Sequence, residues 1–330
     1  MVINDRRWML LADSAQAVVD VFKADSRRYD NRALPDSPSA IDAARGELAG
    51  TGTSWGPAPV ADADQETTLV AIAAIDHLEA LAVLLKASMT FYAPVTVARG
   101  CVEAAAGLVH LMDASLDVRE RVRRHQNFGL AAAWNVADDA RRLGQPVSAE
   151  DRRRLLDEVR EQAERHQFTF QAGDSRRPPY LVDGTRDCGG RFCKVAADQA
   201  CKCHHRVTIG SQVRGLFDAA PGSAFGAAIY GRLSAVAHGG LHGLVTAFAE
   251  TVPVAGTNYG TLSVTLGRDA VGLGRLCIAA PMAVAKMIPT LYARLGWDSR
   301  RIMGSVEHML DRWQDLVSGR AQGIDPLENP

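Results

Sequence analysis

The feature that most constrains the fold is a long apolar stretch at residues 66–89, ETTLVAIAAIDHLEALAVLLKASM. A helix that is apolar on nearly every face must be surrounded by other elements, so this stretch predicts the central helix of a bundle. Hydrophobic residues make up 47% of the chain but aromatic residues only 6%, so the core must rest on Ala, Leu and Val. These residues favour closely packed helices over sheets. The sequence therefore predicts an all-α fold.

Helical periodicity supports an elaborated bundle of about seven or eight helices. Besides the central stretch, helices are expected over residues 4–28, 93–113, 117–144, 148–166, 223–251, 268–295 and 298–318. Pro94 favours a helix start, and Gly144 a helix end. A short helix over residues 41–48 is also expected.

The helices are grouped into one bundle with two interruptions. Residues 1–29 form an N-terminal helix, residues 64–320 the bundle, and residues 321–330 a polar tail. Residues 30–63 are rich in Pro, Gly and Ser and predict either a flexible loop or an arm that wraps around the bundle. A second interruption, a Cys- and His-rich insertion, covers residues 167–206.

Charge and hydropathy argue against a general nucleic-acid coat and against membrane contact. The formal net charge is −1, and no segment reaches about 18 uninterrupted apolar residues. The N-terminus lacks the apolar core of a signal peptide. We therefore expect a cytoplasmic protein with no membrane partner, in which the six cysteines are reduced.

The insertion gathers six residues that can bind a metal. They are Cys188, Cys193, Cys201, Cys203, His204 and His205. Zinc takes four thiolate or imidazole ligands in a tetrahedron, so two chelating pairs on one loop can hold a structural zinc ion. The alternative is a loop whose thiols are free or partly buried.

A second cluster lies in the stretch IYGRLSAVAHGGLHG, residues 229–243. On a continuous helix, Ser234, His238 and His242 would be spaced four residues apart and form one stripe. Paired histidines at this spacing can chelate a metal, although the Glu of the metalloprotease motif is absent. The alternative is a pair of histidines that are hydrogen-bonded between two helices.

The segment RLSAVAH, Arg232 to His238, resembles the Arg-x(4–6)-His signature of HEPN domains. HEPN domains are helical bundles, and many are metal-independent ribonucleases that act as dimers in toxin and defence systems. The resemblance implies RNA as a partner and a homodimer. It also implies that Arg232 stabilises phosphate charge and that His238 is a general acid or base.

Two longer segments resemble actinobacterial helical proteins of unknown function. They are ARGCVEAAAGLVHLMD, residues 98–113, and YGRLSAVAHG, residues 230–239. Arg99 and Glu103 lie four residues apart, hence on one helical face, and can form an ion pair that fixes helix register. If the two helices meet, Arg99, Glu103, Arg232 and His238 would form one polar pocket, which is a candidate site.

Two other functions remain open. One is a zinc-stabilised scaffold or regulator that binds a partner without chemistry. The other is a metal-dependent oxidase within the bundle, for which Glu103 and His110 are possible iron ligands. The arginines of residues 119–124 alternate with acids at helical spacing and predict a solvated face.

Overall fold

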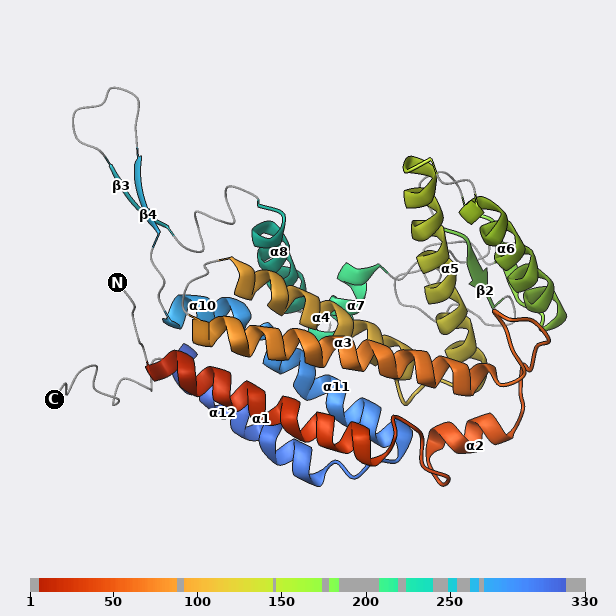
Figure 1. The fold of residues 1–330 in the computed structure, drawn as a ribbon, viewed down its shortest axis with the longest axis horizontal. Helices are drawn as coiled ribbons and strands as arrows, with labels where there is room; N and C mark the ends of the chain where they lie inside the picture. The colour runs from red at the N-terminus through yellow and green to blue at the C-terminus, as the bar shows by residue number, and fades with distance from the viewer. Residues whose placement is uncertain are drawn as a thin grey trace.

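The computed structural model describes residues 6–87, 92–144, 147–173, 178–183, 208–218, 224–239, 249–253, 262–266 and 270–318. The helices are α1 (Arg6–Arg28), α2 (Pro38–Ala44), α3 (Pro59–Ala87), α4 (Ala93–Met112), α5 (Val118–Arg142), α6 (Val147–Arg165), α7 (Ile209–Phe217), α8 (Phe225–Ala237), α10 (Ala270–Cys277), α11 (Ala279–Leu295) and α12 (Arg300–Val317). The strands are β1 (Thr169–Gln171), β2 (Tyr180–Val182), β3 (Ala249–Pro253) and β4 (Leu262–Leu266). The prediction of an all-α fold is confirmed (Figure 1).

The main bundle is built around α3 and α4, which pack side by side. Helix α11 packs against α4, while α1 lies against α3 and α12 against α1 (Figure 1). Helix α3 contacts α1, α2, α4, α5 and α11, which explains its apolar composition. Ala71, Ala74, Leu78 and Leu81 of α3 are fully buried in the core. Small Ala side chains let these helix axes approach closely.

Three helical segments are long and apolar enough to cross a membrane, by length and composition only: α3, α4 and residues 271–295. The expectation that no segment could do so is therefore wrong. That expectation required an apolar run with no interruption. The mean hydropathy of a helix can stay high even when the helix contains a charged residue such as Asp76. Between 44% and 56% of each apolar window is buried in the protein.

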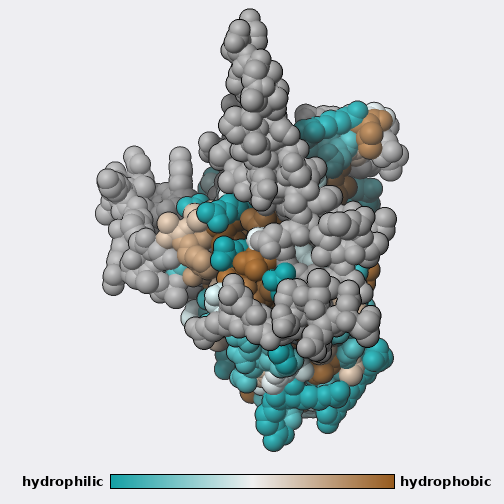
Figure 2. Space-filling view, turned by 90° about the vertical axis from the view of Figure 1, so that its left-hand side faces the viewer, coloured by the Kyte–Doolittle hydropathy of each residue, from teal (hydrophilic) through white to brown (hydrophobic). Residues whose placement is uncertain are grey.

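The outward side of α3 carries both charged and apolar residues. Asp62, Glu66 and Asp76 are exposed on it, and Leu69 and Val83 are 63% and 57% exposed. The end of the bundle seen in Figure 2 likewise shows apolar and hydrophilic patches side by side among the described residues.

A second, smaller core lies beside the bundle and is built by α5, α6, β1 and β2 (Figure 1). The two strands pair antiparallel, with Phe170 opposite Leu181. The buried members of this core are Trp55, Val60, Val118, Val122, Leu130, Val159, Ala163, Phe168 and Leu181. Trp55 is 1% exposed and comes from the segment between α2 and α3, near Val60 but far in sequence from the members on α5, α6 and β2.

Residues 30–63, for which either a flexible loop or a wrapping arm is expected, are packed between the two cores. Helix α2 begins after Ser37, whose hydroxyl accepts a hydrogen bond from the Ala40 amide at 3.2 Å. The helix covers residues 38–44 rather than 41–48, because Pro38 supplies the preferred first helical position. The packing of this segment is that of an arm held against the rest of the chain.

The arm is fixed to α6 through Glu158. This carboxylate accepts hydrogen bonds from the Ser54 amide, from the Trp55 amide at 3.2 Å and from the Thr53 hydroxyl at 3.1 Å. The Trp55 indole N–H donates to the Leu48 carbonyl at 2.8 Å. A Cβ at Gly50 would lie 2.2 Å from the Trp55 carbonyl oxygen, so only glycine fits there.

A buried ion cluster ties α2, α3 and α11 together. Arg294 is 5% exposed; its Nε donates to Asp64 Oδ2 at 2.9 Å and its Nη1 to Asp42 Oδ2 at 2.6 Å. Ser39 Oγ donates to the same Asp64 oxygen at 2.6 Å. Burial lowers the pKa of Arg294, but the two aspartates outweigh it and raise the pKa above its ordinary value. Arg294 therefore stays charged inside the protein.

The arginines of residues 119–124 do not form a solvated face, so that prediction is wrong. Arg121 and Arg123 are 3% and 5% exposed. Arg121 Nη1 donates to the Leu111 carbonyl at 3.0 Å, at the end of α4, where helical carbonyls lack partners within the helix. Arg119 Nε donates to Asp183 Oδ2 at 2.8 Å. These side chains connect α5 to the structure on either side of it.

Helix α8 is shorter than the expected helix over residues 223–251. It ends at Ala237, and Gly239 has a φ of +66°, a left-handed conformation that ends a helix. The prediction of one continuous helix over residues 223–251 is therefore wrong. His242, the third member of the expected stripe, lies outside the described residues. Strands β3 and β4 follow as an antiparallel pair that extends away from the bundle (Figure 1).

Candidate functional site

The candidate site lies where α8 packs against α4. Arg99 and Glu103 come from α4, Tyr230 comes from α8, and His238 is the C-cap residue directly after α8; we call these four residues the α4–α8 cluster. Arg99 and Glu103 are one helical turn apart, and Arg99 Nε donates to Glu103 Oε1 at 2.7 Å. This pair turns the rest of the guanidinium toward α8.

Arg99 makes the contacts that join the two helices. Its Nη1 lies 2.8 Å from His238 Nε2, and its Nη2 donates to the Tyr230 hydroxyl at 3.4 Å. The Tyr230 hydroxyl in turn donates to Glu103 Oε1 at 3.1 Å. Because a guanidinium can only donate, His238 Nε2 must accept, and the neutral ring then carries its proton on Nδ1.

The Arg99–Glu103 pair is half-buried, which strengthens its interaction, whereas His238 is exposed. The side chains of Arg99 and Glu103 are 16% and 28% exposed. Burial lowers the pKa of Arg99, but hydrogen bonds to Glu103 and Tyr230 outweigh this effect and raise it. Burial raises the pKa of Tyr230. Arg99 is therefore a permanent cation that is paired with the Glu103 carboxylate and fixed beside a neutral phenol and an imidazole. Its N–H groups can donate to an anion as well as to these partners.

The structure brings together three of the predicted site residues and separates a fourth. Arg99, Glu103 and His238 meet, whereas Arg232 is exposed and makes no hydrogen bond or ion pair among the described residues. Arg232 and His238 are six residues apart, about 120° around an ideal helix, so they point in different directions. The prediction that Arg232 would lie in one polar pocket with Arg99, Glu103 and His238 is therefore wrong for Arg232.

Tyr230 is the residue of the α4–α8 cluster that was not predicted from the sequence. It precedes His238 by about two helical turns and so lies on a similar side of α8, where it contacts Arg99. That spacing was the available signal. The six predicted zinc ligands, Cys188, Cys193, Cys201, Cys203, His204 and His205, all lie outside the described residues.

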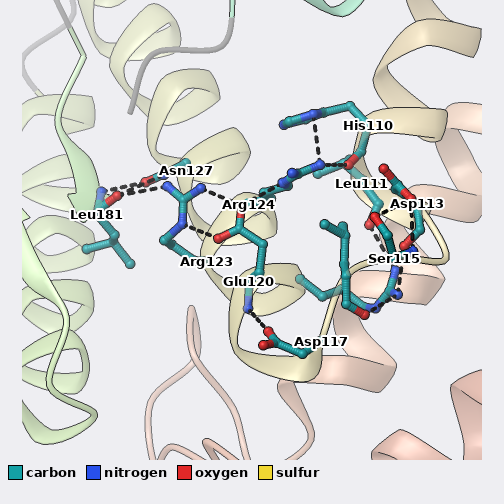
Figure 3. A network of polar contacts seen from close by, with 12 residues as sticks. His110, Leu111, Asp113, Ser115, Asp117, Glu120, Arg123, Arg124, Asn127 and Leu181 are labelled. Atoms are coloured by element: carbon teal, nitrogen blue, oxygen red, sulfur yellow. Dashed lines mark hydrogen bonds and ion pairs between the residues drawn. The ribbon is translucent and has the colours of Figure 1, made fainter. Parts of the chain in front are cut away.

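The possible iron ligands Glu103 and His110 are bonded to different arginines. Glu103 binds Arg99, whereas His110 Nδ1 lies 3.1 Å from Arg124 Nη1 (Figure 3). Arg124 Nε also donates to Glu120 Oε1 at 2.7 Å, and Arg123 binds the same carboxylate. In the described part of the chain, no group of three or more His, Cys, Asp or Glu side chains is placed to hold a metal ion.

The His110 network predicts a pH dependence of stability. Burial and the nearby Arg124 guanidinium lower the pKa of His110 to about 4. Because the folded protein holds His110 neutral while the unfolded chain protonates it, stability is lost as the pH falls from about 6.5 toward 4. We expect His110→Gln to reduce this loss by roughly 3 kcal/mol, measured by urea unfolding at several pH values. An unchanged pH slope would contradict the prediction.

Comparisons of the sequence with protein-family models and with curated proteins, and of the fold with solved structures, gave no match.

Proposed function

We propose that the α4–α8 cluster is the catalytic centre of a metal-independent, HEPN-like ribonuclease that acts in RNA processing or defence. The observation that supports this most directly is the 2.8 Å contact between the Arg99 guanidinium and His238 Nε2. It joins a fixed cation to an exposed imidazole. A phosphodiester needs these two groups for cleavage without a metal: one to bind the phosphate and one to move the proton.

Each residue of the cluster has a role in this reaction. Arg99 carries five N–H donors and uses three of them on Glu103, His238 and Tyr230. The remaining donors can bind a phosphate oxygen. When substrate frees Nε2, the neutral His238 ring can take the proton of the ribose 2′-hydroxyl. The O2′–P bond forms, the P–O5′ bond breaks, and the leaving 5′-oxygen takes a proton from water.

The proposal transfers the phosphate-binding role from Arg232 to Arg99. Arg232 is exposed and turned away from His238 within one chain, whereas Arg99 touches the ring. Glu103 and Tyr230 position Arg99, because each forms a hydrogen bond with it and they bind each other. Arg232 then provides a matched control on the same helix as His238.

We expect His238→Ala to lower RNA cleavage by about 100-fold or more, and Arg99→Ala by a comparable factor because a charge-stabilising donor is lost. Arg232→Ala should cleave at nearly the wild-type rate, and a chelator should have no effect. The measurement is single-turnover cleavage of a labelled RNA.

Three results would count against this assignment. If His238→Ala cleaved RNA as fast as the wild type, the proposed ribonuclease mechanism would be ruled out. Loss of cleavage on chelation would replace it with a metal-dependent reaction. A loss in Arg232→Ala as large as in Arg99→Ala would return the phosphate-binding role to Arg232, as the HEPN resemblance implies.

We also propose a structural zinc ion in the insertion, which would suit a scaffold as well as an enzyme. The support is the density of ligands: four cysteines and two histidines between residues 188 and 205. Metal analysis of the purified protein should find one zinc per chain, which Cys201→Ser or Cys203→Ser removes. A metal-free protein with titratable thiols would exclude zinc. If zinc is present but RNA is not cleaved, the zinc-stabilised scaffold becomes the better proposal.

A further inference from the structure

A group of arginines gathers where α1 ends and α12 begins. They are Arg27, Arg28, Arg32, Arg300 and Arg301, all of them exposed; we call this surface, with Tyr29, the Tyr29 corner. Asp30 and Asp298 lie among them, so the corner carries a net charge of +3. The whole chain carries −1. Positive charge is therefore concentrated at this corner.

Tyr29 holds the corner together. Its ring stacks on Trp297 with centroids 5.1 Å apart, and the Arg28 guanidinium lies 5.2 Å from the Tyr29 centroid. The Trp297 indole N–H donates to the Arg32 carbonyl at 2.8 Å. Trp297 is 4% exposed and packs edge-on against the buried Tyr292. The half-buried Tyr29 ring is thus fixed on a rigid base, beside cationic side chains.

Three of the arginines are available for a ligand. Arg32 pairs with Asp30 and Arg300 with Asp298. Arg27, Arg28 and Arg301 are exposed and have no salt-bridge partner within 4 Å among the described residues. Arg28 still lies close enough to Asp298 to help Arg300 lower the pKa of that carboxyl. Exposed guanidinium groups beside an anchored aromatic ring match the chemistry of single-stranded nucleic-acid binding, in which cations contact phosphates and rings stack on bases. One face of Tyr29 is stacked on Trp297, so a base can stack on the ring only where it displaces the Arg28 guanidinium.

We infer that the Tyr29 corner is a docking surface for single-stranded RNA. The choice of RNA over other polyanions rests on the proposed ribonuclease function and on the aromatic ring, which a lipid headgroup would not need. Helices α1 and α12 lie on the side of the bundle away from α8 (Figure 1). The corner is therefore separate from the α4–α8 cluster and contributes to binding rather than to chemistry.

The test compares two triple variants with the same change in charge. The first is Arg27→Gln, Arg28→Gln and Arg301→Gln; the control is Arg153→Gln, Arg154→Gln and Arg165→Gln on the exposed side of α6. Binding of a labelled single-stranded RNA of about 20 nucleotides is followed by fluorescence anisotropy at several salt concentrations. Both variants should retain the wild-type circular dichroism spectrum.

We expect the corner variant to bind RNA at least about tenfold more weakly than the wild type. The slope of log K against log salt concentration should become less steep by about 2, because each of the three lost phosphate contacts contributes about 0.7 to it. The control should stay within about twofold of wild type. Equal slopes for the corner variant and the wild type, or an equal loss in the control, would overturn the inference. So would binding to vesicles of phosphatidylserine but not to RNA.

Failure of this inference is distinguishable from failure of the proposed function. Binding is measured without cleavage, and His238→Ala should leave it unchanged. If the corner variant binds RNA more weakly but the wild type does not cleave RNA, the docking surface is supported and the ribonuclease function is excluded. If His238→Ala abolishes cleavage but the corner variant keeps the wild-type affinity for RNA and the wild-type KM, the ribonuclease function is supported and the docking surface is excluded.

Discussion

Replacing Trp55 by Ala is expected to lower the free energy of unfolding by about 3 to 5 kcal/mol. Trp55 is 1% exposed at the centre of the second core, where it lies 5.4 Å from the His166 ring and 5.9 Å from Phe168. The substitution leaves a cavity that cannot collapse fully, because the surrounding side chains come from α5, α6 and β2. Urea unfolding followed by circular dichroism measures the change.

The matched control for Trp55 is Phe128 on α5. Phe128 is 42% exposed, so Phe128→Ala should cost no more than about 1 kcal/mol. Hydrogen exchange should show faster opening of α6 than of α4 in Trp55→Ala, because only the second core loses its centre. Equal costs for the two substitutions would show that Trp55 does not anchor this core.

The second large effect is expected at Arg294. Arg294→Met should lower the free energy of unfolding by about 3 to 5 kcal/mol, since it leaves Asp64 and Asp42 without their cation. Asp64 is 3% exposed and has no access to bulk water as a substitute. The same urea unfolding experiment measures the loss.

A second substitution separates loss of charge pairing from loss of packing. In the Arg294→Met background, Asp64→Asn removes the uncompensated negative charge, so part of the lost stability should return. An exposed ion pair provides the control: Arg142, 72% exposed in its contact with Asp138, should cost about 0 to 1 kcal/mol on replacement by Met. If Asp64→Asn lowers stability further, the buried charge is not the cause.

The sequence was sufficient to predict elements whose boundaries have local causes. Helix α4 was expected over residues 93–113 and covers 93–112, because Pro94 determines its start. The end of α8 was not predicted, since a glycine inside a helical pattern is often tolerated. At Gly239 the backbone instead turns to a φ of +66°. Nothing in the local pattern distinguishes the two outcomes.

In the candidate site, too, only the features with a local cause could be predicted from the sequence. The Arg99–Glu103 pair follows from a spacing of four residues, but the approach of α8 to α4 depends on tertiary packing. The packing of α8 against α4 places Tyr230 and His238 in contact with Arg99 and leaves Arg232 exposed. The arginines of α5 were misread for a similar reason. Their partners are carbonyls of residues such as Leu111 and Leu181, which a charge pattern does not reveal.

The position of Trp55 in the chain has a consequence for biosynthesis. Its partner Glu158 lies 103 residues further on. At ordinary rates of synthesis the ribosome takes roughly 5 to 20 s to make that length of chain. During this interval the side of the core formed by α6 is missing, so the indole cannot be fully buried. The second core can close only after α6 has left the ribosome, whereas α1, α3 and α4 can begin to associate earlier.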